Sequence, residues 1–166
     1  MRISPPLFIL LLATLLLGAC GFHLRGNEAM PFQTLYLDAA NPGSLLVRDL
    51  RLSLEGNHVT LAGSAEQADV VLNIVSEVPD KQILTLGGSG RVSEFQLGYR
   101  VSLRAYDLKK QEWLRAEEIS MRRDYSFDDT KILAKEAEEL LLFQSMRSDM
   151  VQQIMRRLSR AKLQTN

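Results

Sequence analysis

The 166-residue sequence contains a single cysteine, Cys20, so no disulfide bond can form within the chain. It has only two histidines, His23 and His58, and with no second cysteine a metal site or a Cys–His nucleophile pair is unsupported. A serine in a G-x-S-x-G turn is also missing. The sequence therefore gives no basis for catalysis, a metal or a cofactor, and we expect a protein that is not an enzyme.

The sequence has no excess of charge of either sign, because 20 Lys and Arg stand against 20 Asp and Glu. A chain of zero net charge has no global attraction to polyanions, including nucleic acid, so any recognition of anions must be local. The Gly-rich stretch 87–90 lacks the lysine and the helix of a phosphate-binding loop. We interpret it as the tip of a β-hairpin.

The first 20 residues have the pattern of an export signal. One charge, Arg2, precedes an apolar run over 7–17 that is too short to cross a bilayer. Leu17-Gly18-Ala19-Cys20 fits the lipobox, in which the thiol receives a diacylglyceryl group before cleavage. We therefore predict that residues 1–19 are a cleaved lipoprotein signal peptide and that Cys20 is the acylated first residue of the mature protein. The alternative is an ordinary secretory signal that leaves Cys20 as a free thiol.

The residue after the cysteine predicts the membrane to which the lipoprotein is sorted. In enterobacterial-type sorting an Asp there favours retention in the inner membrane, so Gly21 predicts the outer membrane. The mature chain is long enough for one compact domain. We predict an acylated N-terminal segment over 20–31, a single α+β domain over 32–161 and a C-terminal tail over 162–166.

Apolar periodicity predicts the elements of this domain. Alternation over 92–106 is the clearest strand pattern, since every odd residue from Phe95 to Ala105 is apolar. Its neighbour, over 113–127, changes phase near Glu117-Glu118, which predicts a β-bulge. The remaining expected elements are strands at 32–37 and 70–75, the second bending or bulging near Pro79 and resuming over 83–86, and helices at 45–56 and 131–160.

This order predicts a two-layer α+β sandwich. The helix between the first two strands favours a right-handed crossover, so these strands should be parallel in a mixed sheet. We expect a four-stranded sheet in β-α-β-β-β-α order, with both helices packed on one face.

Three segments resemble a known family, the lipopolysaccharide-assembly lipoprotein LptE. Residues 20–26, CGFHLRG, resemble its lipobox and following segment, C-G-[FW]-H-L-R. Residues 93–97, SEFQL, resemble the start of its A-E-Y-Q-type strand, and 132–136, ILAKE, resemble the start of its second helix. The order and length of the elements agree with the family over 20–160.

The resemblance implies a non-enzymatic role at the outer membrane. Members of the family sit in the lumen of the outer-membrane β-barrel LptD, plug it, assist its folding and take part in delivering lipopolysaccharide, which they also bind. Lys135 matches the family's lipopolysaccharide-contacting lysine. Arg91 lies a few residues from the position of the contacting arginine, so it is a displaced candidate. A lipoprotein subunit of a periplasm-spanning phospholipid ABC-type transport system remains the alternative function.

The presence of each of these basic residues can also be explained without lipopolysaccharide binding. Arg91 could be a solvated surface residue, and Lys135 could form a helix ion pair with Glu138 or Glu139. Four arginines on the two long strands could line the sheet face that meets a barrel wall or a ligand; they are Arg100, Arg104, Arg122 and Arg123. Cross-strand pairing with Glu117 or Glu118 is the explanation that we favour for them.

Overall fold

The computed structural model describes residues 29–88 and 90–162. The predicted signal peptide, Cys20 and the family-like segment 20–26 lie outside the described residues and stay predictions. The elements, in chain order, are β1 (Thr34–Ala39), α2 (Leu45–Gly56), β2 (Thr60–Leu61), the 3₁₀ turn η1 (Ala65–Gln67), β3 (Val70–Leu86), β4 (Val92–Tyr106), β5 (Glu112–Ser126), the 3₁₀ turn η2 (Asp129–Lys131) and α3 (Ile132–Ser159).

These strands form one mixed sheet in the order β2-β1-β3-β4-β5. β1 runs parallel to both β2 and β3, whereas β4 is antiparallel to both of its neighbours, β3 and β5. The α+β class, the mixed sheet and the parallel pairing across the first helix are therefore confirmed. The predicted count of four strands is wrong, because the two-residue strand β2 adds a fifth at the edge beside β1.

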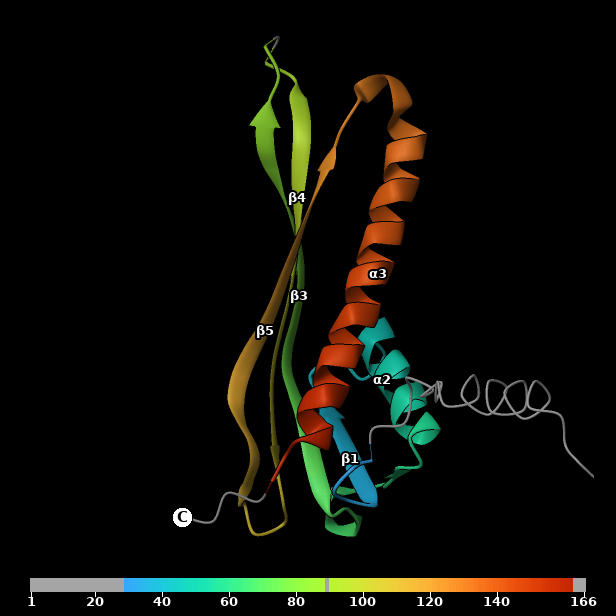
Figure 1. Cartoon of the computed structure of the whole chain (residues 1–166), viewed down its shortest axis with the longest axis vertical. Coiled ribbons are helices and arrows are strands. Elements are labelled where there is room, and N and C mark those ends of the chain that lie inside the picture. Colours follow the sequence, from blue (N-terminus) through green and yellow to red (C-terminus); the bar gives the residue numbers. More distant parts are fainter. Residues whose placement is uncertain (1–28, 89, 163–166) are drawn as a thin grey trace, which may run out of the picture.

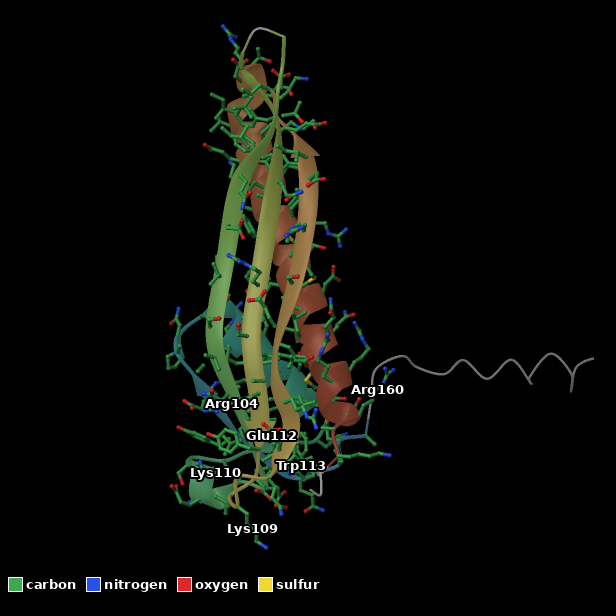
Figure 2. The ribbon with its side chains drawn as sticks, turned by 90° about the vertical axis from the view of Figure 1, so that its left-hand side faces the viewer. Arg104, Lys109, Lys110, Glu112, Trp113 and Arg160 are labelled. Atoms are coloured by element: carbon green, nitrogen blue, oxygen red, sulfur yellow. The ribbon has the colours of Figure 1, made fainter. Side chains whose placement is uncertain are left out.

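The long axis divides the molecule into two unequal halves (Figures 1 and 2). β1 pairs with β3 only as far as Ala39 opposite Ile74, so the half near the β4–β5 turn, here the proximal half, has all five strands. Beyond that point β3, β4 and β5 continue with α3 alone beside them, and we call this the distal half. The 28 residues of α3 correspond to about 42 Å of helix, which is long enough to span both.

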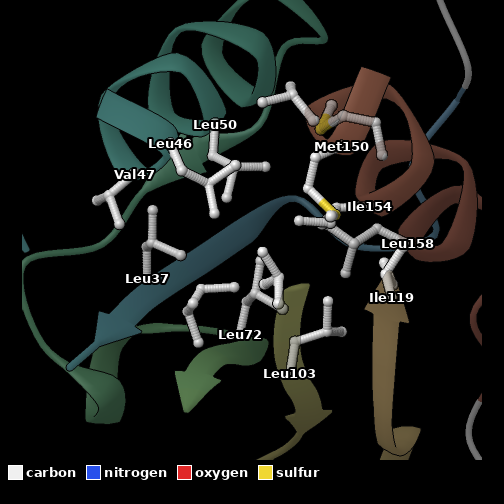
Figure 3. Packing of buried hydrophobic residues seen from close by; sticks show 14 of the residues in the cluster. Leu37, Leu46, Val47, Leu50, Leu72, Leu103, Ile119, Met150, Ile154 and Leu158 are labelled. Carbon is white, nitrogen blue, oxygen red and sulfur yellow. The ribbon is translucent and has the colours of Figure 1, made fainter. Parts of the chain in front are cut away.

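The apolar core fills the proximal half, where both helices cover the same face of the sheet (Figures 1 and 3). Leu46 and Leu50 of α2 and Ile154 and Leu158 of α3 are fully buried above the sheet, which contributes Leu72 and other side chains. The Ser44 hydroxyl accepts a hydrogen bond from the backbone N–H of Val47 and so caps the start of α2. No helix of the described part of the chain is long and apolar enough to cross a membrane.

The predicted bulge in the last strand is present, slightly before its expected place. Leu103 pairs with Glu117, and Ala105 pairs with Leu114. Between these two pairs β5 advances by three residues and β4 by only two. The extra residue lies within 115–116 and restores the core-facing phase, with Ile119 and Tyr125 buried beyond it.

The bend expected near Pro79 is wrong, because β3 is one continuous strand and Pro79 pairs with Tyr99 inside it. A proline is tolerated there because β3 has no strand on its other side past Ile74. The bulge lies instead at Val75, since Ile74 pairs with Leu103 and Ser76 with Ser102. It changes the phase of β3, so that Glu77 and Lys81 beyond it face α3.

Gly98 lies on the opposite face of the sheet, where Asp80 of β3 folds across it. An added Cβ would overlap the carboxyl group of Asp80, which can rotate away because its side chain is 28% exposed, so Gly98→Ala should lower the free energy of unfolding by no more than about 1 kcal/mol. In an Asp80→Ala background the same change should cost much less. Chemical denaturation of the four proteins of this double-mutant cycle measures the difference, and equal costs in both backgrounds would contradict the contact.

Candidate functional site

On the helix-facing side of the distal half, polar contacts add to the apolar packing of Leu97, Tyr99 and Val101. Lys81 Nζ lies 2.5 Å from a carboxylate oxygen of Glu139 on α3, and the Tyr125 hydroxyl donates to the same oxygen at 2.6 Å. The Lys81 ammonium also lies 4.1 Å from the centre of the Phe95 ring. We call Lys81, Phe95, Tyr125 and Glu139 the Lys81–Glu139 cluster.

Electrostatics within the cluster favour its charged form. Burial lowers the pKa of Lys81, but its contacts with Glu139 and Tyr125 outweigh that effect and leave the pKa raised. Burial similarly raises the pKa of Glu139, but Lys81 and Tyr125 reverse it and the pKa is lowered. Burial and the carboxylate of Glu139 raise the pKa of Tyr125, so its hydroxyl remains a donor. The cluster therefore joins α3 to β3 and β5 as an ion pair.

The lowered pKa of Glu139 predicts a pH dependence of stability. A carboxylate whose pKa is lower in the folded state stabilises the fold above its unfolded value of 4.5, and this contribution is lost as the pH falls through the folded value. The stability advantage of the wild type over Glu139→Gln should therefore shrink between pH 7 and pH 3. Urea denaturation at several pH values measures it. Glu136→Gln, on the exposed surface of the same helix, is the control and should show no comparable trend.

Both predicted lipopolysaccharide-binding residues lie at the distal end and contact the connection between β5 and α3. Arg91, with its side chain 72% exposed, forms an ion pair of 2.9 Å with Asp129. Lys135, only 16% exposed, pairs with Glu138 at 2.8 Å and donates to Ser126 at 3.2 Å. The ion pair considered for Lys135 is thus present, with Glu138 rather than Glu139. The structure brings the two cations to one end of the molecule, and each already has an acidic partner.

Large apolar side chains are also exposed at this end of the molecule, on the end of β3 and on the first half of α3. This distal apolar surface consists of Ile83, Leu84, Leu86, Ile132, Leu133, Leu140 and Leu141. Leu133 is 82% exposed, although it lies within a well-formed helix. Exposed apolar side chains grouped in this way mark a surface that binds something. Leu133, Leu140 and Leu141 begin an apolar stripe that Val151, Ile154 and Leu158 continue, a pattern that predicts a core-facing side for the whole helix. The structure contradicts this for the first three leucines, whose exposure lies between 65% and 82%.

The strand arginines have partners other than the acids predicted for them. Arg100 approaches Asp80 at 4.0 Å, and Arg123 pairs with Asp149 of α3 at 2.9 Å. Glu117 instead pairs with Arg157 of α3 at 2.9 Å. Ion pairing therefore explains two of the four strand arginines, Arg100 and Arg123. The Arg123–Asp149 and Arg157–Glu117 pairs also link α3 to β5.

Comparison with known proteins identifies the family. The sequence profile of LptE, described as Lipopolysaccharide-assembly, matches residues 32–158. The LPS-assembly lipoprotein LptE of Pectobacterium atrosepticum is 31% identical over 153 residues, which cover 90% of this chain and 82% of that protein. The chain belongs to the LptE family.

Solved structures agree with membership in LptE. A lipoprotein B from Nitrosomonas europaea matches with a TM-score of 0.72 and 38% identity, over 84% of this chain and 90% of that one. The rare lipoprotein B from Shewanella oneidensis matches with a TM-score of 0.66 and 29% identity, over 74% and 91% of the two chains. LptE is a family of assembly lipoproteins and not an enzyme family. Sequence reasoning missed the Lys81–Glu139 cluster, because its two ion-pair partners are 58 positions apart.

Proposed function

We propose that this LptE-family protein is an outer-membrane lipoprotein, anchored through Cys20, that plugs and assists assembly of an LptD-like β-barrel and takes part in lipopolysaccharide transport to the outer leaflet. In this proposal it binds lipopolysaccharide at the distal end, where Arg91 and Lys135 contribute. Family membership supports the assembly role. The observation that carries the binding site is the placement of both cations at the same end of the molecule as the distal apolar surface.

Lipopolysaccharide is an amphiphile whose lipid carries phosphates beside acyl chains. A protein that binds it needs Arg or Lys for the phosphates and apolar surface for the chains. The distal end presents both kinds of group, and its cations are held by ion pairs that a phosphate could replace. Exposed ion pairs contribute little to stability, so exchanging Asp129 for a phosphate as the partner of Arg91 would cost the fold little.

Replacing Arg91 and Lys135 together by Asp tests the binding site. Each cation that contacts a phosphate contributes on the order of 1.5–3 kcal/mol, so the double variant should bind lipopolysaccharide at least about tenfold more weakly. Binding is measured on purified protein with labelled lipopolysaccharide. Association with LptD, measured by co-purification from outer membranes in mild detergent, should be retained.

The matched control reverses two charges of α2, in the proximal half, in an Arg48→Asp/Arg51→Asp variant. It should bind lipopolysaccharide as the wild type does. Equal binding by wild type and the Arg91/Lys135 variant would overturn the site assignment, and absence of LptD from the captured complex would overturn the assembly role. The comparisons give no support to the alternative, a subunit of a phospholipid transport system.

A further inference from the structure

The proximal end carries a cluster of basic side chains around the β4–β5 turn (Figure 2). Lys109 and Lys110 lie in the turn itself and Arg104 lies on β4 just before it, whereas Arg160 lies with α3 on the other face of the sheet and is not part of this group. Leu108, at the tip beside the lysines, is 56% exposed. This group, which we call the proximal basic surface, combines cations with a protruding apolar residue.

The turn holds these side chains in a defined arrangement. Lys110 adopts a left-handed backbone conformation with φ of 62°, at a position of a hairpin loop where glycine is usual. The Asp107 carboxylate accepts a hydrogen bond from the backbone N–H of Gln111 at 2.8 Å, which closes the turn. The Tyr106 ring lies between Lys110, 4.4 Å from its centre, and Arg104, at 5.3 Å.

Two lysines of this surface have no carboxylate partner, although acids lie nearby. Asp107 accepts the hydrogen bond that closes the turn and Glu112 lies near Arg115 at 3.9 Å, and both keep their negative charge. Among the residues that the structure describes, Lys109 and Lys110 form no salt bridge. Glu66 and Asp69, in and after η1, accept hydrogen bonds from Ser64 and from the start of β1. The proximal basic surface can therefore accept an anionic partner.

The path of the chain identifies the partner. Phe32, at the start of the domain, packs edge-on against Trp113, the residue next to the β4–β5 turn, with ring centres 5.9 Å apart. The chain therefore enters the domain at the proximal end. Only the twelve residues 21–32 separate this point from Cys20, and they span at most about 40 Å. If Cys20 is acylated, the membrane surface lies within reach of this end.

We propose that the proximal basic surface contacts the anionic phospholipid headgroups of the leaflet that holds the acyl chains of Cys20. The inference rests on the lipidation included in the proposed function. Lysines next to a membrane bind anionic headgroups electrostatically, and an exposed leucine between them can enter the interface. The contact fixes the proximal end of the anchored domain at the lipid surface.

The full acylated protein, reconstituted in phosphatidylethanolamine vesicles with or without phosphatidylglycerol, tests this. Acylation blocks Cys20, so a Gln111→Cys substitution gives a single thiol at the turn for an environment-sensitive fluorophore. We expect blue-shifted, stronger emission only when phosphatidylglycerol is present. Lys109→Glu/Lys110→Glu should abolish the response, because each lysine near such a surface shifts the contact equilibrium about fivefold.

The control is Arg122→Glu/Lys131→Glu, which makes the same change in net charge away from the proximal end and should keep the response. The proposal would be overturned if the wild-type protein floated with both kinds of vesicle but its emission did not change with phosphatidylglycerol. Lipidation would be unaffected by that result. A response to lipopolysaccharide vesicles alone would overturn the proposal as well. Failure to float with any vesicle would overturn both lipidation and the membrane contact.

Discussion

Replacing Ile154 by alanine is expected to lower the free energy of unfolding by about 2–5 kcal/mol, whereas the same change at Leu140 should alter it by less than about 0.5 kcal/mol. Both residues lie on α3, so helix propensity affects them similarly. Ile154 is fully buried against the sheet and α2, and its truncation leaves a cavity. Leu140 belongs to the distal apolar surface and is mostly exposed.

Urea denaturation of the two variants measures the contrast. A large loss of stability in Leu140→Ala would mean that Leu140 itself packs in the core, contrary to its exposure in the structure. In the proposed function Leu140 contributes to binding instead. Leu140→Ser should therefore reduce recovery of LptD or lipopolysaccharide while leaving the unfolding midpoint nearly unchanged.

Replacing Cys20 by serine is expected to abolish incorporation of labelled palmitate and to remove the protein from the membrane fraction. Burial of acyl chains contributes about 0.8 kcal/mol for each CH₂ group, and two or more chains give stable anchoring that no other predicted part of the mature chain supplies. Metabolic labelling followed by membrane fractionation measures both effects.

Gly21→Asp is the matched control for this prediction. It keeps the cysteine, so palmitate should still be incorporated, but the sorting rule for the residue after the cysteine predicts retention in the inner membrane. Palmitate labelling of Cys20→Ser equal to that of the wild type would show that the lipobox interpretation is wrong.

Sequence periodicity predicted the elements whose residues repeat over many positions. The alternation of β4 fixed its core-facing side, and the phase change in β5 indicated a bulge next to its observed place. The two-residue strand β2 was not predicted, because two residues carry no period. Pro79 misled the interpretation of β3, since the sequence does not reveal that this stretch of the strand lies at an open edge.

The candidate site was predicted less completely, for a physical reason. Arg91 and Lys135 could be named from the motif, but their partners depend on the connection between β5 and α3, which only the fold brings to them. The long apolar pattern of α3 predicted one continuous buried stripe. The sheet narrows to three strands in the distal half, where Glu139 of α3 faces Lys81 and Tyr125 and where Leu133, Leu140 and Leu141 stay exposed.

The open edge of β3 has a consequence for self-association. From Val75 to Leu86 this strand has no neighbour on one side, and such an edge can template pairing with a second molecule and start aggregation. Pro79 supplies no backbone N–H, and the bulge at Val75 disturbs the regular spacing. Two molecules that met along this edge could not form an unbroken ladder of backbone hydrogen bonds. Pro79 and the bulge therefore protect the monomer against edge-to-edge polymerisation.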